Sequence, residues 1–365
     1  MQQQTKNTLS SQTSERIFFL ELLKAISIIA VVSFHAIFIP RSTFLNSSET
    51  LETLFAPLRF CVPVLLTVSL VLFERQISDS PADSEKPLFK KRLHRLGIPI
   101  LFWFSIATAL KLINGNSILE VIAAIFQGEI FTGAYYFIVL IQVLWNFVLM
   151  REWLYKQQQN IFNLIIIQAI LLLFVYATIG GFFVNPVLQL LLFLERPFII
   201  YWLGYIALGV YIYQNFDWIE RTSYSLTKTH KILILCFTAA TMMAEYQVLS
   251  SMVTGTLRPF DYAAFSCILS VPMMFICFAS VNENSLPIPV VKIVKILSKY
   301  SLGIFCINGI LAQIFLSIGT QLFSETSFNL IQMILIKIIS WIVLFVMSLL
   351  LSIFLERLGL KKIVC

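Results

Sequence analysis

The first long apolar run, residues 17–39, carries three ionisable side chains: Glu21, Lys24 and His35. Ionisable groups inside a bilayer are costly, so they face protein or water rather than lipid. On a helix, Lys24 and His35 project within about 20° of each other and lie ~16 Å apart along the axis. Glu21 precedes Lys24 by about one turn and can pair with it, and a neutral imidazole at His35 could act as a general base. Spacing alone leaves an alternative open, in which His35 is a buried histidine satisfied by a neighbour and the charged pair only snorkels to the interface.

A basic cluster, KKRLHRLGIPI, occupies residues 90–100. Arg92 and Arg95 are three residues apart, so they share one face of a helix near its first turn. Two guanidinium groups in this arrangement could clamp a phosphate or a pyrophosphate. The alternative is an anchor of positive charge at the membrane surface, or a patch for anionic lipid headgroups.

The remaining polar residues of the apolar runs give weaker signals. Ser69 lies in the run VPVLLTVSLVLF, and Lys337 lies in the last run; such residues more often join helices than catalyse reactions. The three histidines, at positions 35, 94 and 230, fall in separate segments, and no CxxC or Cys/His metal spacing is present. We therefore predict no metal site and no permanently bound cofactor.

The composition indicates what must position these groups. Of the 365 residues, 58% are hydrophobic and 12% are charged, whereas soluble domains are about half apolar and about a quarter charged. The mean hydropathy of +0.86 also excludes a disordered chain and a transmembrane barrel. The fold class predicted is an all-α, polytopic bundle of transmembrane helices.

Apolar runs long enough to cross a bilayer number ten. They are roughly 17–39, 54–73, 96–113, 131–150, 161–179, 198–214, 231–249, 262–280, 300–318 and 330–354. With the N-terminus inside, 19 of the 26 Lys and Arg residues fall in inner segments and five in outer ones, which favours cytoplasmic termini. The net charge of +7 thus reflects topology rather than nucleic-acid binding.

The chain is predicted to be one ten-span membrane domain, residues 16–356, in the plasma (inner) membrane. Residues 1–15 are predicted to be a disordered polar cytoplasmic tail, and residues 357–365 a short basic cytoplasmic tail. The apolar segment 182–194 contains a proline and is short, so it is predicted to be re-entrant or interfacial; an eleventh span there would reverse the charge bias.

The opening motif resembles that of the acyltransferase-3 family of integral-membrane acyltransferases. That family opens with Arg, then Leu-Asp, an Arg, an apolar run and a His. Here the corresponding positions are Arg16, Glu21, Lys24 and His35, with charge kept at each substituted position. The sequence RLHR, Arg92 to Arg95, is similar to the family's R-x-x-R motif.

Further segments extend the resemblance over essentially the whole chain. TGAYYFIVLIQ, residues 132–142, is similar to a segment of members that modify exopolysaccharide, and KYSLGIF, residues 299–305, resembles the late Tyr-Ser-x-Gly-Ile-Tyr segment. Two positions depart from the pattern. In the second span the family usually reads Phe-Phe-x-x-Ser-Gly; here Ser69 is kept, but Leu70 replaces the glycine. In the late segment, Asn308 stands where the family usually has a histidine.

The resemblance implies transfer of an acyl group, typically acetyl, from cytoplasmic acyl-CoA to a hydroxyl of a glycan or lipid-linked sugar at the outer side. It implies that His35 is the catalytic base, that Arg92 and Arg95 bind the CoA phosphates, and that Glu21, Lys24 and Ser69 support them. The alternative is a transporter or flippase for a glycan, lipid or small solute. Such proteins often contain internal repeats and interrupted helices, and no clear repeat is present here. The oligomeric state is not implied.

Overall fold

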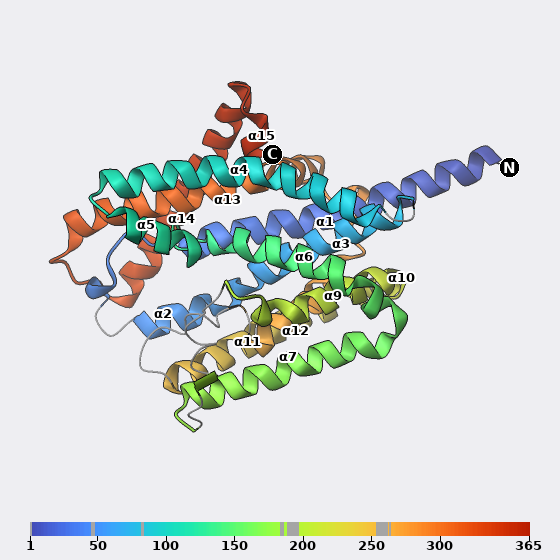
Figure 1. Cartoon of the computed structure of the whole chain (residues 1–365), viewed down its shortest axis with the longest axis horizontal. Coiled ribbons are helices and arrows are strands. Elements are labelled where there is room, and N and C mark those ends of the chain that lie inside the picture. Colours follow the sequence, from blue (N-terminus) through green and yellow to red (C-terminus); the bar gives the residue numbers. More distant parts are fainter. Residues whose placement is uncertain are drawn as a thin grey trace.

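The computed structural model describes residues 2–44, 48–81, 84–182, 186–187, 197–252, 262 and 264–365, with side chains described from Phe18 onward. Within these residues the regular secondary structure is helical, and the helices form an elongated bundle (Figure 1). The prediction of an all-α membrane bundle is confirmed. Most of segment 182–194, which is predicted to be re-entrant or interfacial, lies outside the described residues.

Eight helical stretches of the described part are long and apolar enough to cross a membrane. They are α1 (Gln2–His35), α2 (Ser48–Phe55) continued by η3 (Ala56–Phe60) and α3 (Cys61–Ser78), α4 (Glu85–Ile113), α6 (Tyr135–Lys156), α7 (Gln158–Ile179), α11 (Lys228–Met252), α13 (Ile288–Phe323) and α14 (Leu330–Arg357). Two shorter apolar stretches are η4 (Ile199–Trp202) with α9 (Leu203–Gln214), and α12 (Phe265–Phe278). Together they correspond to the ten predicted apolar runs.

Short helices connect these stretches. They are η1 (Arg41–Thr43), α5 (Ile118–Phe126), α10 (Phe216–Ser225), η5 (Glu283–Ser285) and α15 (Lys361–Val364). Large apolar side chains such as Ile167 of α7, Phe237 of α11 and Leu335 of α14 are more than half exposed. An apolar outer surface of this kind suits lipid rather than water.

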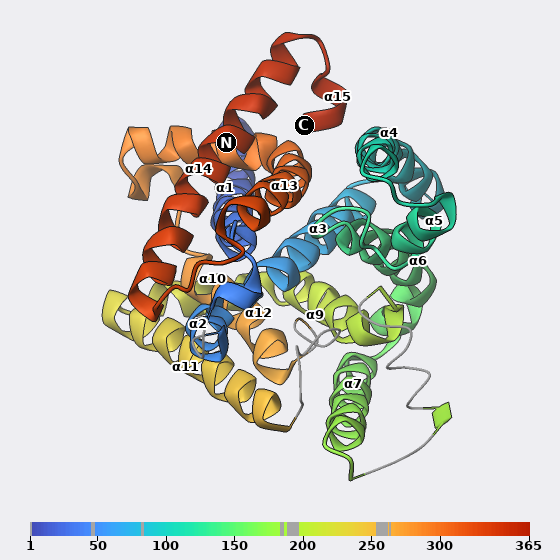
Figure 2. The ribbon, with the colours of Figure 1, turned by 90° about the vertical axis from the view of Figure 1, so that its left-hand side faces the viewer.

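Helix α1 lies in the middle of the bundle (Figure 2) and contacts α3, α12, α13 and α14. In its apolar window 61% of the residues are buried, compared with 17% in α4, so α1 is enclosed by protein whereas α4 is peripheral. No glycine or proline interrupts residues 2–35, and the helix begins at Gln2 rather than after the predicted disordered tail of residues 1–15. Because α1 is enclosed by other helices, its polar side chains face protein groups or internal cavities.

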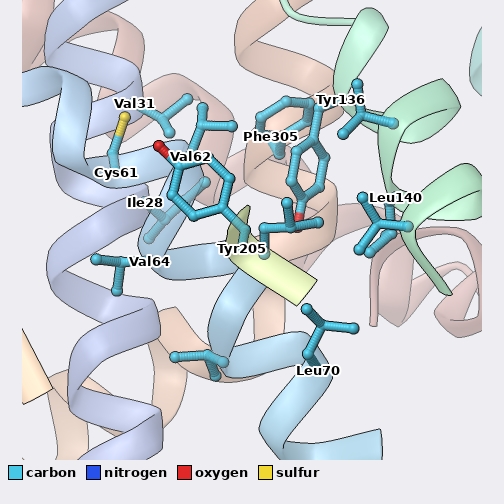
Figure 3. Close-up of a cluster of buried hydrophobic side chains, with 14 of the residues drawn as sticks. Ile28, Val31, Cys61, Val62, Val64, Leu70, Tyr136, Leu140, Tyr205 and Phe305 are labelled. Carbon is cyan, nitrogen blue, oxygen red and sulfur yellow. The ribbon is translucent and has the colours of Figure 1, made fainter. Parts of the chain in front are cut away.

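The buried cluster around α1 explains one departure from the family pattern (Figure 3). Leu70 is fully buried on α3 and faces Gly209 of α9. A Cβ atom at position 209 would lie 2.8 Å from the Leu70 Cβ atom. The small residue at this helix contact is thus on α9, which gives Leu70 the room it needs.

An ionic network joins α3, α4 and α6 at the end of the bundle opposite the C-terminus of α1. Glu74 is fully buried and accepts hydrogen bonds from Arg151 Nε and an Arg151 terminal nitrogen, each at 2.8 Å, and from Tyr155 at 2.7 Å. Arg151 also pairs with Glu85. Each charge in this network faces an opposite charge or a hydrogen-bond donor, so the network joins three helices and no charge in it is left uncompensated.

The C-terminal residues contact the bundle. The indole N–H of Trp103 donates to the Ile363 carbonyl at 2.9 Å, and Ile363 and Val364 of α15 are buried while Lys361 and Lys362 are exposed. The segment 357–365, predicted as a short basic tail, is therefore docked by its two aliphatic residues. The domain boundaries themselves remain a prediction.

Candidate active site

A cavity of about 630 Å³ lies at the C-terminal end of α1. Its walls come from α1, α2, η3, the turn before α6, the segment before α12, α13 and α14, so residues distant in sequence converge on it. Among its polar lining residues are His35, Glu52, Arg59, Glu129, Tyr135 and Lys337. Its volume is within the range of small-molecule sites.

His35, the last residue of α1, lines this cavity and is held by Asn308 of α13. The His35 Nδ1 atom lies 2.9 Å from the Asn308 side-chain oxygen. Asn308 is fully buried, and its NH2 group donates to the carbonyl oxygens of Ile304 and Phe305 at 2.8 and 2.7 Å. The amide oxygen therefore faces the imidazole and can only accept, so in neutral His35 the proton is on Nδ1 and the lone pair on Nε2.

Gly133 makes room for the His35 ring in the turn before α6. Its φ is +89°, in the left-handed region that favours glycine. A Cβ atom at this position would lie 3.1 Å from His35 Cε1 and 3.2 Å from Phe305 Cζ. The turn within residues 132–142 thus brings the Gly133 backbone against the His35 ring. A side chain at position 133 would prevent this close approach.

Aromatic rings form one wall of the cavity. Tyr135 and Tyr262 both line it, and their rings stack with centroids 5.9 Å apart and 27° between planes. Trp202 stacks on both, at 6.5 Å from Tyr135 and 6.4 Å from Tyr262. Tyr135 and Tyr262 thus give this wall apolar ring surface together with two hydroxyl groups, which suits a ligand with both polar and apolar parts.

Two buried cations also line the cavity. Lys337 of α14 is 3% exposed; its ammonium donates to the Ser33 carbonyl at 2.9 Å and lies 4.4 Å from the Phe55 ring centre. Arg59 of η3 is 5% exposed, and its guanidinium lies 5.1 Å from the ring centre of Phe34. Both cations therefore lie close to the residues just before His35.

The arginine cluster lies toward the other end of α1. Arg92 donates to the Ser69 hydroxyl at 2.6 Å and to the Ser69 carbonyl at 3.0 Å, and its guanidinium lies 5.0 Å from the Phe73 ring centre. Arg95 is exposed. Arg92 thus points inward against α3 while Arg95 faces out, although the two residues share a region of α4.

A line of aromatic contacts connects the two ends. Tyr136 interacts electrostatically with Arg92, and its ring lies 5.1 Å from that of Phe305; the two rings lie side by side in Figure 3. Phe305 in turn borders Gly133 together with His35. Packed aromatic side chains therefore extend from the cavity to Tyr136, which lies on the side facing the arginine cluster.

The structure brings some of the predicted site residues together and separates others. Ser69 contacts Arg92, and Lys24 interacts electrostatically with Glu21 and with both arginines. His35 lies at the cavity, whereas these five residues are outside its described lining. The predicted site thus consists of two groups, one at the C-terminal end of α1 and one about three turns earlier along this helix.

Sequence reasoning missed most of the residues around His35. The sequence analysis assigns no role to Arg59 or Glu52, and it interprets Lys337 as a residue that joins helices. The signal that could have found Lys337 is a lysine in the middle of an apolar run, which calls for a polar neighbour. Arg59 carried no such signal, because only the fold shows that η3 turns it into the cavity.

The fold and the site define a multi-pass membrane protein whose helix bundle contains a cavity lined by a histidine and other ionisable side chains. The sequence profile of the acyltransferase-3 family, described as an acyltransferase domain, matches residues 17–357, so the chain belongs to this family of membrane acyltransferases. The comparisons with curated proteins and with solved structures gave no match.

Proposed function

We propose that this protein is a membrane O-acyltransferase that moves an acyl group, acetyl in the first instance, from cytoplasmic acyl-CoA to a hydroxyl of a glycan or lipid-linked sugar at the outer side of the membrane. The observation that carries the proposal is the hydrogen bond from His35 to Asn308 at the wall of a ligand-sized cavity. It supports a histidine that is preset in the tautomer a general base needs.

The proposed reaction is direct transfer. Nε2 of His35 takes the proton of the acceptor hydroxyl while its oxygen attacks the thioester carbonyl carbon. The C–S bond then breaks, the thiolate takes the proton back from the imidazolium, and the products are an ester and free CoA. The Asn308 side-chain oxygen accepts a hydrogen bond from Nδ1–H throughout and so stabilises the imidazolium while it exists.

The donor is proposed to bind at the end of the bundle where Arg92 and Arg95 lie, with its phosphates on the two guanidinium groups. The bias of basic residues supports assigning this end to the cytoplasmic face of the plasma (inner) membrane. The pantetheine arm would then run along Tyr136 and Phe305 toward His35. Glu21, Lys24 and Ser69 would order the inner half of this path.

The acceptor is proposed to enter the cavity from the opposite side. The stacked rings of Tyr135 and Tyr262 support a sugar, because the C–H faces of sugar rings pack on aromatic rings while their hydroxyls need polar partners. Thr132, Gln313 and Glu129 supply such partners along the cavity wall.

The test is transfer of label from radioactive acetyl-CoA by the purified protein in native-like lipid, with membrane glycans and lipids as acceptors. We expect His35→Ala to lower the transfer rate by about 100-fold or more, the usual range for losing a general base. His230→Ala is the matched control, because that histidine is exposed and outside the cavity.

Undiminished transfer by a folded His35→Ala variant would remove His35 as the base. Movement of unmodified glycan or lipid across vesicles, with no label on it, would favour a transporter instead.

A further inference from the structure

Lys337 of α14 contacts the last turn of α1, a contact to which the proposed reaction assigns no role. Its side chain is 3% exposed. The ammonium donates a hydrogen bond to the Ser33 carbonyl at 2.9 Å and a longer one to the Phe34 carbonyl at 3.5 Å. These two residues directly precede His35. Lys337 therefore binds the stretch of backbone that carries the candidate base.

The carbonyls at the end of α1 need partners from outside the helix. The last carbonyls of an α-helix have no N–H group within the helix to bind, and leaving such groups unpaired away from water is costly. In a longer helix the Ser33 carbonyl would accept from the N–H of Ile37, four residues on. That N–H donates instead to the His35 carbonyl at 2.9 Å. The Lys337 ammonium thus occupies the place that Ile37 would have in a longer helix.

The local sequence alone would let α1 continue beyond His35. The next residues, 36–39, are apolar and include no glycine that would end a helix. Pro40 disfavours helical backbone at the residue before it, so the proline would stop a helix only near Phe38. Tertiary contacts therefore decide that α1 ends at His35. A cation is well suited to this position, because the C-terminus of a helix carries partial negative charge.

The place where α1 ends matters because other elements hold the His35 ring. The Asn308 side-chain oxygen of α13 lies 2.9 Å from Nδ1, and a Cβ atom at Gly133 would lie 3.1 Å from Cε1. The ring fits these neighbours only if the backbone of α1 places it correctly. A displacement of about 1 Å at a reacting group can lower a rate on the order of 100-fold.

We propose that Lys337 is a positioning residue whose ammonium ends α1 at His35 and thereby holds the imidazole against Asn308. The inference rests on the proposed acyl transfer, in which His35 is the general base. Lys337 itself makes and breaks no bond in that reaction. Its effect on the rate is therefore exerted through His35 and should vanish when the imidazole is absent.

The first test is a double-mutant cycle on acetyl transfer from labelled acetyl-CoA by the purified protein in native-like lipid. We expect Lys337→Met to lower kcat about 10-fold or more, with the KM for donor and for acceptor changed less than about 3-fold. In a His35→Ala background the same substitution should change kcat less than about 2-fold, because no imidazole remains to be positioned. Lys337→Arg keeps a cationic donor and is expected to recover most of the rate.

The second test needs no activity and follows the modification of His35 by diethylpyrocarbonate, measured by mass spectrometry. We expect His35 to react at least about 3-fold faster in Lys337→Met than in the wild-type protein, because a loosened helix end opens more often. In Lys337→Arg it should react at the wild-type rate. The exposed His230 is the internal reference. Lys292→Met is the matched control and should change neither readout, since that lysine is exposed on α13 and outside the cavity.

An equal loss of kcat in both backgrounds, or an unchanged modification rate of His35 in Lys337→Met, would make Lys337 a packing residue only and would overturn the proposal. If Lys337→Met does not fold, Lys337→Gln, which is neutral but can still donate a hydrogen bond, is judged by the same two criteria. Faster modification of His35 in the variant, with no acetyl transfer by the wild-type protein, would support the positioning role and remove the acyltransferase proposal. Normal transfer by both the wild-type protein and Lys337→Met would do the reverse.

Discussion

The two ends of α1 bury charged side chains in opposite ways. At its C-terminal end, His35, Arg59 and Lys337 surround a cavity of about 630 Å³. Toward its other end, Arg92 is held against α3 by Ser69, and Arg151 is held by two carboxylates. The ionisable side chains line a cavity at the C-terminal end of α1, whereas Arg92 and Arg151 are held by other side chains toward the other end.

The difference matches two separate tasks. A reaction needs volume, a preset base and charges that a ligand can reach, all of which the cavity end has. Holding helices in register needs charges that are already paired, so that removing one partner leaves the other exposed to a low-dielectric interior. At the end that holds Arg92 and Arg151, the paired end, variants of the Arg151–Glu74 ion pair should therefore change stability, whereas variants of Arg92 and Ser69 should change donor binding. At the cavity end, variants should change turnover.

The largest effect is expected at the paired end. Arg151→Met leaves Glu74, which is fully buried, without its cation. Loss of one partner of a buried ion pair costs about 3 kcal/mol, so we expect the purified protein to unfold at a clearly lower temperature. Lys156→Met is the control on the same helix, because Lys156 is exposed. Equal unfolding temperatures for the two variants would mean that the network carries no stability.

At the cavity end we expect Asn308→Leu to lower kcat by about 100-fold while the unfolding temperature changes less than in Arg151→Met. A leucine cannot accept a hydrogen bond from Nδ1–H, so the tautomer and orientation of His35 are no longer fixed. Asn308→His provides an acceptor again and is expected to recover part of the rate. A fall in stability without a change in kcat would assign Asn308 to packing alone.

Gly133→Ala is expected to lower kcat by about 10-fold, because the added Cβ atom would press on the His35 ring at 3.1 Å. Gly115→Ala is a close control: its φ is +87°, similar to the +89° of Gly133, but no atom lies within 4 Å of the added Cβ. Both variants share the backbone strain of a left-handed residue, so only the contact with His35 differs. If both lose activity equally, strain rather than contact is responsible.

The sequence predicted the helices better than the site. Continuous apolar runs without glycine or proline are enough to predict a helix such as α1, and an imidazole at the end of such a run marks His35. The hydrogen bond to Asn308 spans 273 positions of sequence, so no local pattern could predict it. Lys337 meets the Ser33 carbonyl across 304 positions for the same reason: tertiary packing alone brings α14 to the end of α1.

Arg92→Ala tests whether Arg92 binds the acyl-CoA donor or only anchors the helix at the membrane surface. We expect the KM for acetyl-CoA to rise about 10-fold, since one phosphate loses a charged hydrogen-bond donor, with little change in the KM for the acceptor. Lys90→Ala removes an equal charge from the same basic cluster but at an exposed position. A similar rise in both variants, or lowered membrane insertion alone, would favour a general electrostatic anchor.

The smallest effect is expected for Ser69→Ala. The hydroxyl accepts from Arg92 at 2.6 Å, but the Ser69 carbonyl accepts from the same nitrogen at 3.0 Å and remains in the variant. One hydrogen bond of a pair contributes about 1 kcal/mol, so the KM for acetyl-CoA should rise about 5-fold. Ser105→Ala is the control, because its exposed hydroxyl bonds only to its own helix at Leu101. An effect as large as that of Arg92→Ala would mean that Ser69 does more than orient the arginine, and that this end of α1, like the other, presents a polar group directly to substrate.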